Sequence, residues 1–200
     1  INATLSVMPP LFFAKLKHHK RTIRSLVHQV VYPELPNKLN IQDVIQHNIC
    51  KIKGLDLMPG DIELYEDFIL AEIIYDQSLG NKQNFTNTWR KMEDSLIKGV
   101  LNSVVDQYDF ILIDFSPGDH LITRSGIIAS DYYIMPAKPE PLSVVGIGIL
   151  QGRIKQFKDG DRSNIGLIGI IFTSLGPTSQ MTKKIKQRLI KDFGKQSLFN

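Results

Sequence analysis

One run of eleven residues constrains the fold more than any other part of the chain. Residues 108–118 read Tyr-Asp-Phe-Ile-Leu-Ile-Asp-Phe-Ser-Pro-Gly, so four apolar residues, 110–113, precede an acid and a Pro-Gly break. Such a run predicts a short strand buried on both faces. Asp114 would then lie at the carboxyl end of the strand, where open α/β sheets bind their ligands. Two interpretations of Asp114 remain open from these residues: a ligand of a metal ion or metal-bound water, and a cap of the next helix.

The rest of the chain alternates between apolar strands and amphipathic helices. Spacings of three and four residues between apolar positions predict helices over 23–30, 89–104, 147–157 and 181–193. Short apolar runs predict strands at 55–58, 131–135 and 167–172. This alternation indicates an α/β fold with a mostly parallel sheet and helices on both faces, a three-layer sandwich.

Local signals place several further segments. Asn40 is a typical helix cap and predicts a short helix over residues 40–48. Asp61 is placed to cap a helix that follows Pro59-Gly60, and the acids of that helix, Glu63 among them, are interpreted as a solvated face. Residues 77–88 are polar and lack periodicity, which predicts a loop.

Composition narrows the class of protein. A hydrophobic content of 42% in 200 residues suits one globular domain, and no apolar run approaches the length of a membrane span. The single cysteine, Cys50, excludes an intramolecular disulfide framework and favours a reducing, cytoplasmic setting. The formal charge of +4 permits contact with nucleic acid without requiring it. The basic stretch 9–21 is interpreted as a solvated loop or helix end.

Two stretches of the chain together resemble a known family. Residues 108–118 and residues 129–146, which begin Ala-Ser-Asp-Tyr-Tyr-Ile-Met-Pro-Ala-Lys-Pro-Glu-Pro, resemble the ParA/MinD group of P-loop ATPases. The resemblance continues through 57–60 and 166–173 and covers most of residues 40–195. It implies a P-loop NTPase-like sandwich that binds ATP and Mg²⁺.

The resemblance also implies a role for individual residues. Asp114 would be the Walker B carboxylate, which holds Mg²⁺ through water. The turn that senses the γ-phosphate would be formed by Ser116, Pro117 and Gly118. The loop that walls the adenine and ribose would contain Pro136, Pro139 and Glu140. Thr173 stands where many relatives carry an adenine-reading asparagine, so base recognition is left open.

The start of the chain matches a motif of the family only in part. Asn2 and Thr4 fit the end of its Asp-Pro-Gln-x-Asn-x-Thr motif, and no G-x-x-x-x-G-K-[ST] phosphate loop occurs in the 200 residues. We therefore expect residues 1–200 to be a single nucleotide-binding domain that is cut before its first residue and also after its last. Alone, this segment is expected to be inactive.

The function that the resemblance implies is that of a ParA-type partitioning ATPase. Such a protein would dimerise around two nucleotides, bind DNA non-specifically and be stimulated by a partner protein. We expect the DNA contact on the last helix, opposite a buried stripe of Met181, Ile185 and Leu189. Its cations are Lys183, Lys184, Lys186, Arg188 and Lys191. Three alternatives stay open: a MinD-like regulatory ATPase, a cobyrinic-acid-synthase-type amidotransferase and a degenerate interaction domain. The amidotransferase would require a glutaminase domain with a reactive cysteine, and Cys50 lies at a predicted helix end that does not favour this role.

Overall fold

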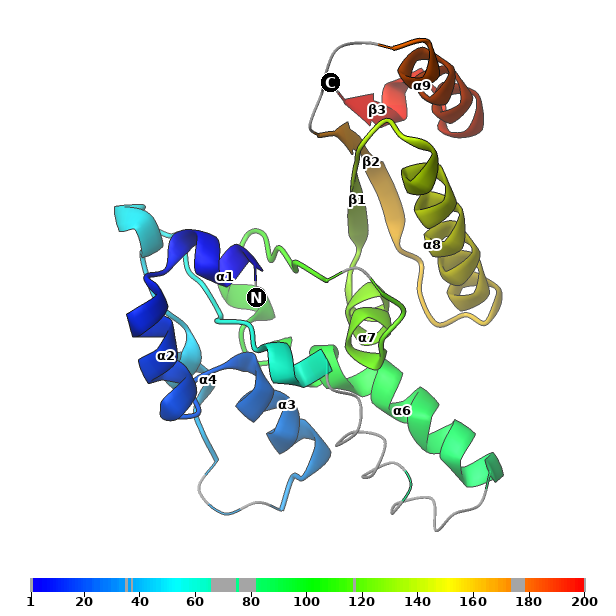
Figure 1. Ribbon diagram of the computed structural model, residues 1–200. Helices are drawn as coiled ribbons and strands as arrows, with labels where there is room; N and C mark the ends of the chain where they lie inside the picture. The colour runs from blue at the N-terminus through cyan, green and yellow to red at the C-terminus, as the bar shows by residue number, and fades with distance from the viewer. Residues whose placement is uncertain are drawn as a thin grey trace. The chain divides into compact units, whose positions relative to one another are not determined.

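The computed structural model describes residues 2–34, 36, 38–65, 75, 82–116, 118–173 and 179–199. The chain divides into two compact units, Ile1–Gly126 and Ile127–Asn200, which are described separately (Figure 1). The prediction that residues 1–200 form one domain stays a prediction. None of the helices among the described residues combines the length and the apolar character that a membrane-spanning segment requires.

The first unit is helical. Its elements are α1 (Asn2–Val7), α2 (Pro10–His18), α3 (Ile23–Val31), α4 (Ile41–Val44), η1 (Ile49–Lys51), η2 (Ile62–Tyr65), α6 (Lys82–Leu101), η3 (Val105–Gln107) and α7 (Leu121–Ala129), the last of which continues into the second unit. Its core forms where the apolar stripes of α3 and α6 meet, with Val27 and Leu96 fully buried. Gly99 permits this close approach, because a Cβ there would lie 2.9 Å from Val30 Cγ1.

Several segments of this unit differ from the sequence prediction. The basic stretch forms α2, which begins at Pro10, where the fixed φ of proline suits a first helical position, and which buries Leu16. Residues 82–88 belong to α6 instead of a loop, and the rings of Phe85 and Trp89 stack there one turn apart. The helix after Asn40 ends at Val44, because Gln46 pairs with Leu57 in an isolated antiparallel bridge.

The predicted strand over residues 110–113 is absent from the described structure. The segment is extended but joins no ladder, and Phe110 and Leu112 are 86% and 89% exposed. Ile111 and Ile113, on the other side of the pleat, are half-buried. The apolar run supplies the preference for an extended backbone, but a strand also needs a hydrogen-bonded neighbour, and none of the described strands supplies one.

The second unit is built on a parallel sheet. Its elements are β1 (Tyr132–Ala137), α8 (Pro141–Asp159), β2 (Gly166–Phe172), α9 (Gln180–Phe193), η4 (Lys195–Ser197) and β3 (Leu198–Phe199), with strand order β1-β2-β3. Both α8 and α9 pack on one face of this sheet, where Met135 and Ile170 meet Ile147 and Leu189 (Figure 1). Parallel strands joined by helices confirm the predicted α/β class.

Candidate functional site

Asp114 lies beside the start of a distant helix. Its Oδ2 accepts a hydrogen bond from the backbone N–H of Ala3 at 3.3 Å, although the two residues are 111 positions apart. The first amides of a helix lack internal partners and carry partial positive charge, so a carboxylate is favoured there. The alternative that Asp114 caps the next helix is wrong, because α7 begins only at Leu121.

The surroundings of Asp114 fit a water-mediated magnesium site. The side chain is exposed, and its Oδ1 accepts no hydrogen bond from the described residues. Within the described part of the chain, no group of three or more His, Cys, Asp or Glu side chains could enclose a metal ion. Mg²⁺ commonly keeps several waters and binds through one or two carboxylates together with substrate phosphates. An exposed carboxylate such as Asp114 can bind Mg²⁺ in this way.

The turn after Asp114 is shaped by two glycines. Gly118 has φ +142°, and a Cβ there would lie 2.5 Å from His120 Nε2, so a side chain is excluded. Gly126 makes room for Phe115, whose Cζ would lie 1.9 Å from an added Cβ. Ser116, two residues before Gly118, is half-buried, and Pro117 lies outside the described residues.

A fork of hydrogen bonds supports the far end of this turn. Arg124 Nε and Nη2 donate to the two carboxylate oxygens of Asp119 at 2.7 and 2.8 Å. Arg124 Nη1 also donates to Glu93 Oε1 at 3.0 Å, and that carboxylate is buried. Hydrogen bonds to Asp119 first, and then to Glu93, hold the pKa of Arg124 above its ordinary value although burial opposes this. The guanidinium therefore stays charged and ties the start of α7 to α6.

A turn at residues 59–63 joins α1 to the start of α3. The hydroxyl of Thr4, which is buried, accepts from the N–H of Gly60 at 2.9 Å. The hydroxyl of Thr22 donates to Asp61 Oδ2 at 3.0 Å, and both side chains are buried. Asp61 Oδ1 also accepts from the N–H of Glu63 at 3.1 Å, which confirms the prediction that Asp61 caps the next helix. Thr22 was not singled out in the sequence, because its partner lies 39 positions away.

Glu63 forms an ion cluster instead of the predicted solvated face. Lys17 Nζ lies 2.6 Å from Glu63 Oε1, and Arg24 Nη1 donates to the other carboxylate oxygen. The hydrogen bond with Glu63 raises the pKa of Lys17, and the same bond lowers the pKa of Glu63. The charges come from α2, α3 and η2, so the cluster fastens these elements together.

The remaining predicted nucleotide residues lie in the second unit. The N–H of Thr173 donates to the carbonyl of Ala137 at 2.9 Å, which brings Thr173 to the start of the loop at 138–140. Pro136 is the fifth residue of β1 and is exposed, an allowed position because β1 is an edge strand. Pro139 is half-buried and Glu140 is the exposed N-cap residue of α8. The unit thus gathers these four residues at the carboxyl ends of β1 and β2, and their roles stay predictions.

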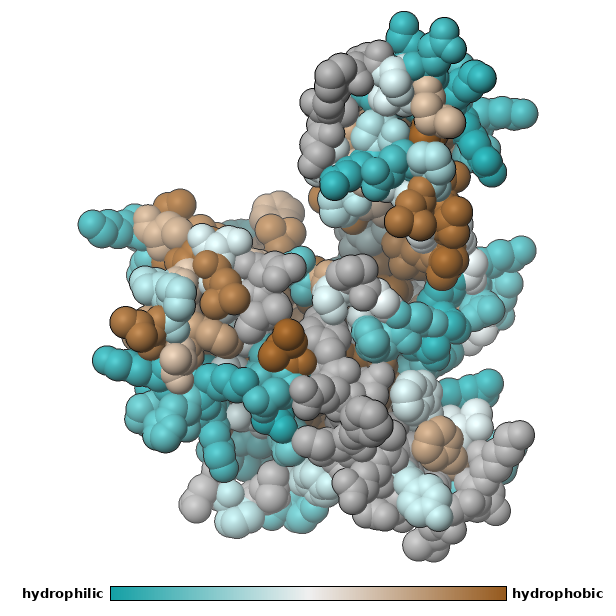
Figure 2. Space-filling view, viewed as in Figure 1, coloured by the Kyte–Doolittle hydropathy of each residue, from teal (hydrophilic) through white to brown (hydrophobic). Residues whose placement is uncertain are grey.

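The cations of α9 only partly follow the predicted face. Ile185 and Leu189 are buried as expected, whereas Met181 is 56% exposed, because it lies in the first turn beyond the edge of the core. Lys186 is half-buried with its Nζ 4.8 Å from the ring centroid of Phe172, a cation–π contact. The exposed cations are Lys183, Lys184, Arg188 and Lys191. Arg188 Nε lies 3.7 Å from Asp192 Oδ2. Figure 2 shows hydrophilic side chains gathered over α9.

A hollow of about 330 Å³ lies elsewhere, beside α3, α4 and α6. Gln29, Gly99 and Gln107 are among its lining residues. None of the predicted nucleotide residues lines it, so we do not assign it to ATP.

Comparison with known proteins bears on these predictions. The family model described as "AAA domain" matches residues 12–167. The chromosome-partitioning ATPase Soj of Treponema pallidum is 25% identical over 175 residues, covering 85% of this chain and 60% of Soj. A ParA family protein of Chlamydia pneumoniae is 44% identical over 121 residues, covering 60% of this chain and 41% of that protein. An uncharacterised protein of Mycobacterium tuberculosis is 27% identical over 157 residues, and the chain spans only 44% of its length.

Solved structures agree on the fold. An ATP complex of McdA from Cyanothece superposes with a TM-score of 0.65 at 16% identity, over 89% of this chain and 60% of McdA. A plasmid partition protein from Borrelia burgdorferi gives a TM-score of 0.58 at 17% identity, over 94% of this chain and 68% of that one. The solved structures show the shared fold, and the family model over most of the chain, together with the Soj and ParA relatives, shows that the chain belongs to the ParA-like P-loop ATPases.

Proposed function

We propose that the protein containing this chain binds ATP with Mg²⁺, hydrolyses it and acts as a partitioning ATPase. The observation that carries the proposal is the placement of Asp114, an exposed carboxylate with one open oxygen, beside the turn at Gly118. Support comes from the Treponema relative, which is a chromosome-partitioning ATPase, and from McdA, which was solved with ATP.

Each predicted residue has a physical role in this proposal. Asp114 would hold Mg²⁺ through water, and the ion when bound would neutralise charge on the β- and γ-phosphates. Gly118, with φ +142°, adopts a backbone that favours glycine, and a backbone N–H beside a glycine suits close approach of an anion; Ser116 and Pro117 would act with it as the γ-phosphate sensor. Pro136 and Pro139 would wall the adenine and ribose, and the hydroxyl of Thr173 can serve as donor or acceptor to the base.

The wider activity belongs to the same proposal. ATP would join two copies in a homodimer, and the dimer would bind DNA non-specifically through α9. A partner protein would stimulate hydrolysis, and the single exposed Cys50 suits a cytoplasmic setting.

Replacement of Asp114 tests the metal role. In the complete protein, Asp114→Asn should lower ATP turnover by at least about tenfold, because a neutral amide is a weaker partner for metal-bound water. The amide oxygen can still accept from the N–H of Ala3, so thermal stability should be preserved. Asp109→Asn, at an exposed acid in the same extended segment, is the matched control and should keep wild-type turnover. Normal turnover by Asp114→Asn would remove this residue from the metal site, and a complete wild-type protein that does not turn over ATP would defeat the proposal.

Replacement of lysines on α9 tests the DNA surface. Lys183→Ala/Lys184→Ala removes two exposed cations, and losing two phosphate contacts should flatten the slope of log affinity against log salt by about 1.8. Lys155→Ala/Lys158→Ala, at exposed positions on α8, is the charge-matched control. Binding should be measured on the ATP-bound full-length protein across a salt series. If the α9 and α8 variants behave alike, α9 is not the DNA surface.

A further inference from the structure

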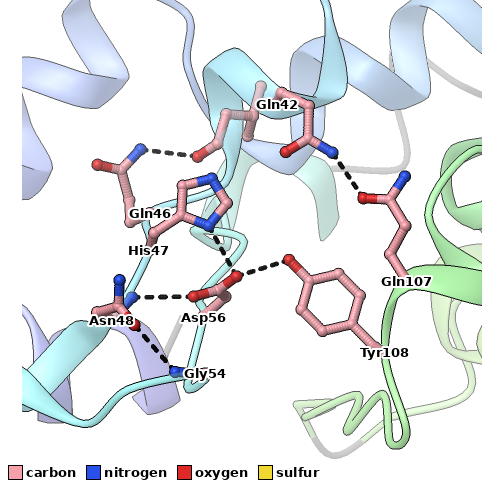
Figure 3. A network of polar contacts seen from close by, with 9 residues as sticks. Gln42, Gln46, His47, Asn48, Gly54, Asp56, Gln107 and Tyr108 are labelled. Atoms are coloured by element: carbon pink, nitrogen blue, oxygen red, sulfur yellow. Dashed lines mark hydrogen bonds and ion pairs between the residues drawn. The ribbon is translucent and has the colours of Figure 1, made fainter.

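Asp56 is the centre of a polar network that the sequence did not reveal. Its carboxylate accepts hydrogen bonds from His47 Nδ1 at 2.7 Å, from the N–H of Asn48 at 2.9 Å and from the hydroxyl of Tyr108 at 2.8 Å (Figure 3). His47 and Asn48 come from the segment before η1, whereas Tyr108 begins the extended segment that carries Asp114. One carboxylate therefore joins two parts of the first unit that are 52 residues apart in sequence.

The protonation states keep this network intact near neutral pH. Partial burial works against ionisation of Asp56, but the hydrogen bonds from Asn48, Tyr108 and His47 outweigh it and lower the pKa of the carboxyl. Burial, together with the hydrogen bond to Asp56, raises the pKa of Tyr108 to about 12. Tyr108 therefore remains a donor and Asp56 remains an ionised acceptor, the stronger kind of hydrogen bond.

The network matters because few other polar contacts hold residues 108–114 within the part of the chain that the structure describes. Between Tyr108 and Asp114 the backbone bends at Asp109 and then joins no ladder among the described strands, and Phe110 and Leu112 are exposed to solvent. Residues 108–114 form a span of seven residues. The polar contacts that fix this span lie at its ends: Tyr108 with Asp56 at the start, and Asp114 with Ala3 at the finish.

A second contact reinforces the start of the span. Gln42 Nε2 donates to Gln107 Oε1 at 3.0 Å, one residue before Tyr108 (Figure 3). This pair is exposed, so water can replace either partner at little cost. The Tyr108 hydroxyl is only partly exposed and is bonded to a charged group, which makes it the contact whose loss would release the segment.

We propose that Asp56 and Tyr108 are positioning residues for Asp114, and that they fix the register of residues 108–114 so that the Asp114 carboxylate is presented to the metal-bound nucleotide. This inference rests on the proposed ATPase function. Neither residue touches the nucleotide. Their effect on hydrolysis passes through Asp114 alone.

The test is a mutant cycle in the complete, ATP-hydrolysing protein. Tyr108→Phe removes only the hydroxyl, and we expect kcat to fall about tenfold or more while the KM for ATP stays within about twofold, since a net loss of this size accompanies one hydrogen bond to a charged group. Asp56→Asn should give a similar loss of kcat, and the double variant should be no slower than the slower single variant, because both changes break one contact. In an Asp114→Asn background, Tyr108→Phe should change single-turnover hydrolysis by less than about twofold.

A matched control separates this role from general stability. The hydroxyl of Tyr133, in the second unit, accepts from Gln151 Nε2 at 2.7 Å and is also partly buried. Tyr133→Phe therefore removes a comparable hydrogen bond far in sequence from Asp114, and its kcat should be unchanged.

Each outcome decides between explanations. Wild-type kcat in both Tyr108→Phe and Asp56→Asn, with Asp114→Asn inactive, overturns the positioning role and leaves the proposed function standing. A full additional loss from Tyr108→Phe in the Asp114→Asn background also overturns it, because the tyrosine would then act by another route. Full activity of Asp114→Asn removes Asp114 from the metal site and with it the positioning role, whereas a complete wild-type protein without ATP turnover defeats the proposed function itself.

Discussion

The buried pair of Thr22 and Asp61 offers a direct measure of what holds the first unit together. Thr22 is 1% exposed and Asp61 3% exposed, and the hydroxyl of Thr22 donates to Asp61 Oδ2. Thr22→Val keeps the shape of the side chain and removes the donor. Asp61 then stays buried with the N–H of Glu63 as its remaining close donor and Lys17 Nζ at 3.9 Å. We expect Thr22→Val to destabilise the unit.

The magnitude follows from the charge on the acceptor. A hydrogen bond to a charged group contributes about 1.5–3 kcal/mol, and valine recovers part of the loss by burying a methyl group in place of a hydroxyl. The expected net loss is about 2 kcal/mol. With a urea m-value of about 2.5 kcal/mol/M, this loss corresponds to a midpoint roughly 0.8 M lower.

Trp89 provides the assay. It is the one tryptophan in the sequence and lies in α6, so its fluorescence reports unfolding of the first unit. Its indole N–H donates to Glu93 Oε1 at 2.9 Å in the folded protein, a contact that unfolding breaks. Urea titrations followed at this tryptophan give the midpoint for each variant.

Thr123 is the matched control. Its Oγ1 is buried and finds no hydrogen-bond partner among the described residues. Thr123→Val is the same chemical change in the same unit, but it removes an unsatisfied hydroxyl and should leave the midpoint unchanged or raise it. Equal decreases for Thr22→Val and Thr123→Val would refute the argument, because the loss would then come from the substitution itself and not from the bond to Asp61.

Two further predictions concern the turn after Asp114 and the response to pH. Gly126→Ala should lower the free energy of unfolding by about 1–3 kcal/mol in urea titrations, because its Cβ would lie 1.9 Å from Phe115 Cζ. Gly146→Ala in α8 should instead stabilise its helix by about 0.5–1 kcal/mol in thermal melts, because a Cβ there meets nothing within 4 Å. The pKa of Tyr108 is raised to about 12, so the folded state keeps a proton that the unfolded state releases above about pH 10. The free energy of unfolding should therefore fall as pH rises from about 10 to 12. Tyr108→Phe should remove that part of the pH dependence. A Tyr108→Phe variant with the same alkaline slope as wild type would show that burial and the hydrogen bond to Asp56 do not raise the pKa of this tyrosine in the folded protein.

The amphipathic helices could be predicted because their signal is local. The apolar spacing that begins at Ile23 marks the buried side of α3, and the spacing through Ile147 and Phe157 marks that of α8. The start of a helix leaves no such signal where its first residues are polar. Residues 82–88 carry no stripe of their own, and they become helical as the first turns of α6.

The contacts that shape the candidate site left no signal in the sequence. Asp56 and Tyr108 are 52 positions apart, and Thr22 and Asp61 are 39 apart, so no spacing rule connects them. The hydrogen-bonded pairing of a strand with its neighbour is equally non-local. Residues 110–113 have the composition of a strand, but pairing depends on a neighbour that composition does not specify.

Charge explains why the turn at residues 59–63 lies where it does. Residues 1–33 contain five lysines and arginines and no aspartate or glutamate, so any carboxylate that pairs with α2 or α3 comes from elsewhere in the chain. Glu63 is such a carboxylate, because it forms ion pairs with Lys17 and Arg24. These ion pairs hold the turn at residues 59–63 against α2 and α3. The N–H of Ile23 then donates to the carbonyl of Pro59 at 3.0 Å.

The same turn reaches Asp114 through α1. The hydroxyl of Thr4 accepts from the N–H of Gly60, and the neighbouring residue, Ala3, donates its N–H to Asp114. Adjacent residues of one short helix thus bond the turn on one side and the candidate metal ligand on the other. Because the ion cluster fixes the turn and the turn fixes α1, the environment of Asp114 depends on residues 59–63, none of which belongs to the predicted nucleotide site.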